Sequence, residues 1–80
     1  MNAYHLRYED FQWLLHREVS RAPLAVFDVK QDAVEFSKLY ARHYHGVLII
    51  EDPDHDIEEQ RDYSENARRP NVTLVFATIR

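Results

Sequence analysis

Apolar side chains recur with a helical period between residues 29 and 44 and then run together between residues 47 and 50. At about 100° per residue, one stripe of the first segment faces a core while its charged side chains face water. The stripe comprises Val29, Ala33, Phe36, Tyr40 and Tyr44, with Ser37 beside it. Leu39 lies roughly 100° off this stripe and is expected to be exposed. The pattern predicts one amphipathic helix that packs on the rest of the chain.

Residues at both ends of this helix favour defined boundaries. Asp28 is the predicted N-cap, because its carboxylate accepts a hydrogen bond from a free amide of the first turn, and Gln31 completes a capping box. Gly46, the only glycine of the chain, is predicted to end the helix with a positive φ, which glycine adopts without steric penalty. Residues 47–50 are apolar on both faces, which predicts a central strand.

Two segments near the N-terminus, residues 4–8 and 11–17, alternate apolar and polar side chains, as half-buried strands do. A two-residue turn at Glu9 and Asp10 joins them in a predicted hairpin whose large apolar side chains all lie on one side. The positions predicted to face each other are Tyr8 and Phe11, Leu6 and Trp13, and Tyr4 and Leu15. Residues 18–23 are expected to form an irregular link, and residues 24–27 a short approach to the helix.

The segment that follows the central strand predicts a turn and a polar edge strand. Residues 52–56 combine Pro53 with aspartates, which is typical of a turn. Residues 57–63 carry charged side chains in succession, which suits an edge strand that must discourage mispairing. Residues 64–71 are polar and form a predicted linker to a C-terminal strand, residues 72–79.

The C-terminal strand is apolar on both sides and needs covering. One side carries Val72, Leu74 and Phe76, and the other carries Val75, Ala77 and Ile79. Either this strand inserts into its own sheet or it pairs with a second copy of the chain.

We therefore predict a single α+β domain over residues 1–80, with an antiparallel sheet in the order ββαββ plus the C-terminal strand, and with one helix packed on one face.

Composition narrows the compartment and the class of partner. The absence of cysteine excludes a disulfide framework and a thiolate zinc site, and it fits a reducing compartment. No run approaches the ~20 apolar residues of a membrane helix, and the N-terminus lacks an apolar signal core, so we expect a cytoplasmic protein without membrane contact. A net charge of −4 argues against a general nucleic-acid binder.

The five histidines invite a metal hypothesis, because imidazole is the commonest transition-metal ligand. His5 and His16 are predicted to lie diagonally on the outer face of the hairpin, and His43 and His45 flank the helix end. Neither pair has a third ligand at a recognisable spacing. We therefore predict solvated histidines and no bound metal.

Other site chemistries are also missing from the sequence. The aspartates of residues 52–56 imitate a calcium loop, but Ile57 and Tyr63 stand where that loop needs glycine and glutamate. No nucleophile lies beside a base, and one glycine cannot supply a phosphate cradle. We predict a protein that is not an enzyme and that has no cofactor.

Acidic residues make the first candidate contact surface. Eight of the fourteen acidic residues lie between residues 51 and 65, opposed only by Arg61. A charge run of this kind is usually a solvated face, but one on an edge hairpin can also steer a partner of opposite sign, so a protein with a basic surface is a candidate partner. The candidate residues are Glu51, Asp52, Asp54, Asp56, Glu58 and Glu59.

Apolar residues make the second candidate surface. The two-faced C-terminal strand and Leu39 together expose more apolar surface than one helix covers, which predicts a homodimer. The candidate dimer contacts are Leu39, Leu74, Val75, Phe76 and Ile79. The leading hypothesis is thus a small non-enzymatic interaction or regulatory module that self-associates.

The alternative is a nucleic-acid-binding protein that uses a local basic face with aromatic neighbours. Two sets of residues would form such a face, Arg7 with Arg17 on the outer hairpin face, or Lys38 and Arg42 with Arg68 and Arg69. The aromatic residues of the hairpin fall in register with the core side, so packing is their favoured role.

Several features together resemble a known family of short, mostly bacterial proteins, domain-of-unknown-function family 2188, over about residues 4–64. These features are the Tyr4-His5-Leu6 opening, Trp13, Phe27-Asp28 before a helix with Ala33 and Ala41, Gly46, the aspartate-rich turn, and Ile57 followed by Glu59, Arg61 and Tyr63. The resemblance implies a ββαββ sheet with one helix on a face, and it implies no activity.

The chain departs from the family pattern in its turns. The family usually has glycine in both hairpin turns, whereas this chain has Glu9-Asp10 and Asp54-His55 there. His55 is therefore expected to adopt a left-handed conformation. The strand over residues 72–79 lies beyond the usual domain.

Overall fold

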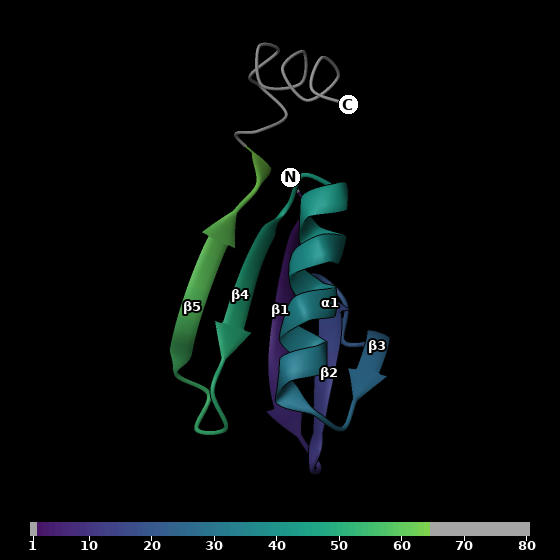
Figure 1. Cartoon of the computed structure of the whole chain (residues 1–80), viewed down its shortest axis with the longest axis vertical. Coiled ribbons are helices and arrows are strands. Elements are labelled where there is room, and N and C mark those ends of the chain that lie inside the picture. The colour runs from purple at the N-terminus through teal and green to yellow at the C-terminus, as the bar shows by residue number, and fades with distance from the viewer. Residues whose placement is uncertain (1, 65–80) are drawn as a thin grey trace.

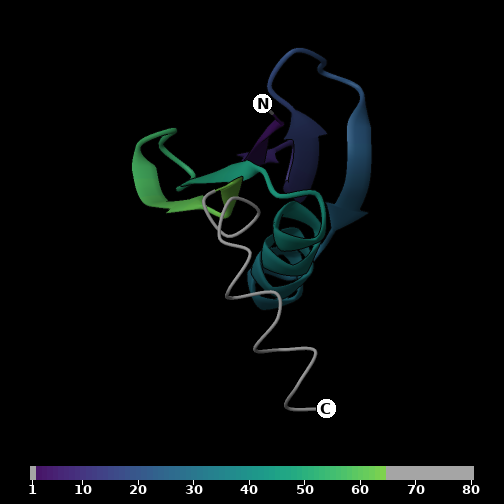
Figure 2. The ribbon, with the colours of Figure 1, turned by 90° about the horizontal axis from the view of Figure 1, so that it is seen from above.

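The computed structural model describes residues 2–64, which form a five-stranded sheet with one helix against it (Figure 1). The elements are β1 (Ala3–Glu9), β2 (Gln12–Arg17), β3 (Pro23–Phe27), α1 (Lys30–His43), β4 (Val47–Glu51) and β5 (Ile57–Asp62). Figure 2 shows α1 lying on one face of a curled sheet. For residues 2–64, the α+β class and the packing of one helix on one face of the sheet are confirmed. The predicted C-terminal strand over residues 72–79, and its linker beyond Ser64, lie outside the described residues.

The sheet is mixed, so the prediction of a purely antiparallel sheet is wrong. The strand order is β3-β2-β1-β4-β5, and β1 pairs with β4 in parallel, from Ala3 opposite Val47 to Leu6 opposite Ile50. The cause is strand β3, which occupies the end of the predicted irregular link and the predicted short approach to the helix. Strand β3 reverses the chain once more before α1, and β4 therefore enters the sheet in the same direction as β1.

Strand β3 pairs with β2 at the edge of the sheet. Trp13 lies opposite Phe27 and Leu15 opposite Ala25. Pro23 is tolerated because it is the first residue of an edge strand, where no ladder hydrogen bond from its nitrogen is needed. The available sequence signal was the short continuous apolar run of residues 24–27, which is consistent with a strand.

The first hairpin is confirmed, but its predicted turn is displaced by one residue. Asp10 and Phe11 form the turn with φ of 51° and 64°, and Tyr8 lies opposite Trp13 rather than Phe11. The pairing has shifted by two residues, and because side chains alternate with a period of two, the predicted core face is preserved. Phe11 itself is displaced into solvent and is 87% exposed.

The core lies between α1 and the near face of the sheet. The sheet contributes six buried side chains, which are Tyr4, Leu6, Trp13, Leu15, Leu48 and Ile50. The helix contributes the small residues Ala33, Ser37 and Ala41, which recur every four residues and let the helix approach the sheet closely. The predicted apolar stripe is thus wrong in its centre, since Val29, Phe36 and Tyr44 lie at its margins and are at least 40% exposed.

The helix begins differently from the prediction. Val29 is the N-cap residue and makes no side-chain capping hydrogen bond, while its carbonyl accepts the first helical bond from Ala33 N at 3.1 Å. Asp28 is therefore not the N-cap. The Gln31 side chain donates to Glu35 along the helix at 3.3 Å instead of closing a capping box.

The helix ends in a Schellman motif in which Gly46 is not the left-handed residue. His45 N donates to Arg42 O at 3.2 Å and Gly46 N to Ala41 O at 2.9 Å, and His45 carries the positive φ of 55°. Gly46 has no positive φ, so that prediction is wrong. A Cβ at Gly46 would lie only 2.6 Å from Asn2 O and 2.7 Å from Tyr4 Cε2. The glycine is required for close approach to β1.

The last two strands follow the prediction. Strand β4 lies between β1 and β5, as expected for a central strand, and β5 is an outermost strand of the sheet that residues 2–64 form. In the turn between them, the Asp52 carboxylate accepts hydrogen bonds from the amides of Asp54 and Asp56 at 2.9 and 3.0 Å. His55 has a φ of 69°, which confirms the expected left-handed conformation.

Candidate interaction surface on helix α1 and strand β3

An aromatic row of Phe36, Tyr40 and Tyr44 runs along the flank of α1. The rings are one helical turn apart, with centroids 5.9 Å apart for Phe36 and Tyr40 and 4.8 Å apart for Tyr40 and Tyr44. Phe27 at the end of β3 extends the row, with its ring 5.3 Å from that of Phe36. Tyr40 anchors the row to the core through an edge-on contact with buried Tyr4 at 5.3 Å.

The aromatic row lies outside the core because smaller residues occupy the buried face of α1. Residues 33, 37 and 41 point at the sheet, and side chains at 36, 40 and 44 follow them by three positions, roughly 60° away around the helix. Phe36 and Tyr44 remain 40% and 46% exposed. Two large rings thus have a packed side and a side that faces water.

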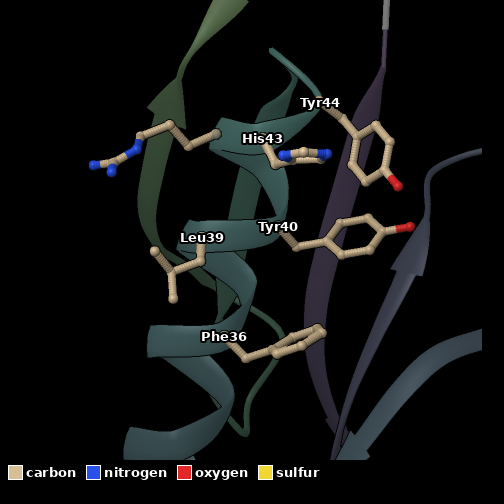
Figure 3. A pocket seen from close by; sticks show the side chains of 6 residues that line it. Phe36, Leu39, Tyr40, His43 and Tyr44 are labelled. Carbon is tan, nitrogen blue, oxygen red and sulfur yellow. The ribbon is translucent and has the colours of Figure 1, made fainter. Parts of the chain in front are cut away.

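A shallow hollow lies over the aromatic row (Figure 3). Its lining consists of Phe36, Leu39, Tyr40, Arg42, His43 and Tyr44. Leu39 points to the side of α1 opposite the three rings and is 62% exposed, which confirms its expected exposure. Leu39, which is a predicted dimer contact, forms one rim of the hollow. The other predicted contacts, Leu74, Val75, Phe76 and Ile79, lie outside the described residues.

The rim of the hollow is basic toward the end of the helix. Arg42 and His43 lie in the last turn of α1, where positive charge is favoured by the negative end of the helix dipole. His43 contacts the Tyr44 ring edge-on at 4.7 Å. Burial raises the pKa of Tyr4, whose ring packs beneath the row. The hollow thus combines apolar walls with an edge that carries the Arg42 guanidinium and the His43 imidazole.

Strand β3 continues the apolar surface along the edge of the sheet. Its residues Ala25 and Phe27 pack against the core on the helix side, whereas Leu24 and Val26 point to the opposite face and are 40% and 46% exposed. Both faces of this edge strand are therefore apolar. The prediction of residues 24–27 as a short approach to the helix did not include this surface.

The predicted acidic residues do not form one uniform surface. Glu51 lies on the sheet face opposite α1, with its side chain 12% exposed, and its carboxylate is 3.2 Å from His5 Nδ1 and 3.5 Å from Arg7 Nε and from His55 Nδ1. Its charge is thus surrounded by cationic or titratable groups.

The other acidic candidates divide between turn and helix contacts. Asp52 holds the turn, Glu58 pairs with Lys30 at 2.7 Å, and Glu59 pairs with Lys38 at 3.2 Å. Hydrogen bonds from Arg61 and Lys38 lower the pKa of Glu59. Asp54 and Asp56 are exposed in the turn. A basic partner for the acidic residues stays a prediction.

His5 and His16 face each other directly across β1 and β2, not diagonally, with stacked rings 5.7 Å apart. His16 Nδ1 lies 2.7 Å from Arg17 O and 2.9 Å from Ser20 O, so that nitrogen is a donor. Within residues 2–64, no three histidine or acidic side chains converge as metal ligands. His16 is buried, so the prediction of a solvated histidine is wrong at this position, and its two contacts with backbone oxygens fix the loop after β2.

The fold does not bring the members of either predicted basic set together. Arg7 lies on the sheet face opposite α1 and pairs with Glu9 and Glu51, whereas Arg17 lies opposite Tyr4 on the helix side. In the second set, Lys38 pairs with Glu59, and only Arg42 lines the hollow. Arg68 and Arg69 lie outside the described residues.

Comparison with known proteins gives a family but no activity. The family model for "Uncharacterized protein conserved in bacteria (DUF2188)" matches residues 4–63. No curated protein and no solved structure matches the chain. In the described part of the chain, no helix is long and apolar enough to cross a membrane.

Proposed function

The chain belongs to domain-of-unknown-function family 2188, a family of uncharacterized bacterial proteins, and we propose that it is a non-enzymatic protein-interaction module that self-associates. The contact surface in this proposal is the aromatic row of α1 together with the edge of β3. The cytoplasm is the proposed compartment, because the sequence has no cysteine.

The observation that carries the proposal is the exposure of large apolar side chains that line one hollow on helix α1. Phe36, Leu39 and Tyr44 are 40%, 62% and 46% exposed around one hollow. Contiguous apolar patches of this kind on small proteins mark interaction sites. Aromatic rings are enriched at the centres of interfaces, because they bury a large area while few rotatable bonds are fixed.

The shape of the surface also favours a protein partner. Tyr40 and Phe36 are held from behind by Tyr4 and Phe27, so the rings are already oriented before a partner arrives. Preorganised side chains lose little entropy on binding, and more of the burial energy remains for affinity. The Arg42 and His43 side chains supply a polar rim of the kind that surrounds apolar interface centres.

Light scattering of the full chain tests the proposal. At micromolar concentration the expected mass is twice 9.6 kDa, and Phe36→Ser is expected to return the mass to that of one chain. Phe11→Ser is the matched control, because Phe11 is 87% exposed in the distant β1–β2 turn. Far-ultraviolet circular dichroism checks that both variants remain folded. A parent mass of one chain, or a dimer unaffected by Phe36→Ser, would refute self-association through this surface.

A second candidate function is single-stranded nucleic-acid binding, and one observation favours it. The half-exposed Phe36 and Tyr44 rings lie beside Arg42 and His43, and exposed aromatic rings with basic neighbours stack bases and hold phosphates. Fluorescence polarisation with a labelled single-stranded oligonucleotide tests it. Binding that weakens with salt and is lost in Arg42→Glu supports this function, whereas no binding at low salt excludes it.

A further inference from the structure

We propose that the edge of β3 receives, as an added strand, the C-terminal segment of a second copy of this chain, residues 72–79. The inference rests on the proposed self-association and identifies the segment of the partner chain that forms the dimer contact. Two copies exchange their C-terminal segments in this arrangement, and the reciprocal contact closes as a symmetric dimer.

The two edges of the sheet differ in what they can accept. Within residues 2–64, β3 and β5 are the outermost strands. Strand β5 carries charged or amide side chains from Glu58 to Asp62, which discourage pairing with an apolar strand. Strand β3 instead presents Leu24 and Val26 on one face and Ala25 and Phe27 on the other. Backbone groups at this edge can pair with an extended segment, as in β-strand addition.

The C-terminal segment matches β3 in pattern. Val72, Leu74 and Phe76 alternate with Val75, Ala77 and Ile79, so a strand of this sequence is apolar on both faces. Next to β3, the side with Leu74 and Phe76 would cover the exposed flank of the aromatic row. The other side would lie beside Leu24 and Val26. The backbone N–H and C=O groups of a docked strand need hydrogen-bond partners. The edge of a strand offers them, whereas an apolar helix face such as the hollow does not.

The position of Ser64 favours a second copy over the same chain. Tyr63 N donates to Gly46 O at 2.9 Å, so the described chain ends beside β4 and the end of α1, at the β5 side of the sheet. A strand beyond β3 lies five strand spacings from β5, about 24 Å measured along the sheet. The eight steps from residue 64 to residue 72 span at most about 26–29 Å when fully extended. Docking within one chain would leave the link almost no slack.

Cysteine cross-linking of the full-length chain tests the inference, and the natural absence of cysteine makes the test clean. Chains that carry Val26→Cys are mixed with isotopically labelled chains that carry Val75→Cys and then mildly oxidised. The expected product is a mixed disulfide between the two chains, identified by mass. Gln60→Cys on β5 is the matched control, and it is expected to give about tenfold less of the mixed product, on the scale of a 1.4 kcal/mol preference.

The outcomes separate this inference from the proposed function. A parent chain with twice the mass of one chain but no Val26–Val75 disulfide retains self-association and overturns the strand exchange. A chain with both cysteines that closes an internal disulfide while remaining a single-chain species shows docking within the same chain, and it also overturns the exchange. Leu74→Lys in the full chain is expected to abolish the dimer and leave the circular dichroism of the domain unchanged.

Discussion

Gly46→Ala is expected to destabilise the domain, although Gly46 lies at a backbone angle that alanine adopts freely. The added methyl carbon would lie 2.6 Å from Asn2 O and 2.7 Å from Tyr4 Cε2, both closer than real Cβ contacts. Asn2 cannot move freely, because its backbone O accepts from Val47 N at 2.8 Å and its Nδ2 donates to Tyr44 O at 3.1 Å. The Tyr4 ring is also held in place, because it is buried and packs edge-on against Tyr40. Making room for the methyl group would disrupt the hydrogen bond between Val47 N and Asn2 O, next to the pairing of β1 with β4.

The expected change in the free energy of unfolding follows from two opposing effects. Overpacking a tight site costs typically about 1–3 kcal/mol. Replacement of glycine by alanine returns about 0.4–1 kcal/mol by restricting the unfolded chain. The net loss is about 1–2 kcal/mol, or a fall in melting temperature of roughly 5–15 °C for a domain of this size.

Thermal and urea unfolding of Gly46→Ala measure this loss, and His45→Gly is the control. His45 has the left-handed φ of 55°, so glycine there relieves backbone strain and is expected to be neutral or stabilising by up to about 1 kcal/mol. Opposite signs at adjacent positions support close approach as the reason for Gly46. A Gly46→Ala variant as stable as the parent would refute it.

Three further predictions concern single residues of the described domain. Ser37→Ala is expected to raise the free energy of unfolding by about 1 kcal/mol in urea titrations, because the buried Ser37 hydroxyl has no hydrogen-bond partner among the described residues, and an unchanged or lower value contradicts this reasoning. Phe11→Gly is expected to raise the melting temperature by about 4–8 °C, because Phe11 is exposed with a φ of 64° and glycine removes that strain, whereas a fall would mean that the ring has a contact that matters. Burial raises the pKa of Tyr4 above 10.0, so the folded state still binds the phenol proton at pH values where the unfolded state has lost it. The free energy of unfolding is therefore expected to fall as the pH rises above about 10. Unfolding measured against pH for the parent and for Tyr4→Phe checks this, and an equally steep fall in the variant would mean that other groups cause the pH dependence.

Local pattern was sufficient to predict most elements. The alternation of residues 4–8 and 11–17 predicts strands, and the helical period of residues 29–44 predicts a helix, because each places apolar side chains on one side. The same patterns predicted β4 at the centre and β5 at the edge. Exposure of Leu39 also followed from its angle around the helix.

The candidate surface was predicted only in part. Leu39 was identified from its position off the stripe, but the exposure of Phe36 and Tyr44 was not. Helical periodicity specifies an apolar face about 100° wide and does not say which row within it points inward. The row with the smallest side chains does so here, because Ala33, Ser37 and Ala41 allow the shortest distance between helix and sheet.

The sequence by itself determined that a helix and strands with one shared apolar side exist, since side-chain periodicity is a property of neighbouring residues. Only the tertiary structure decided that β4 runs parallel to β1, because that direction depends on whether residues 23–27 add a further reversal. It also decided the role of Gly46. The residue lies next to Asn2, which is 44 positions away in sequence, and no local pattern reports contact between segments so far apart.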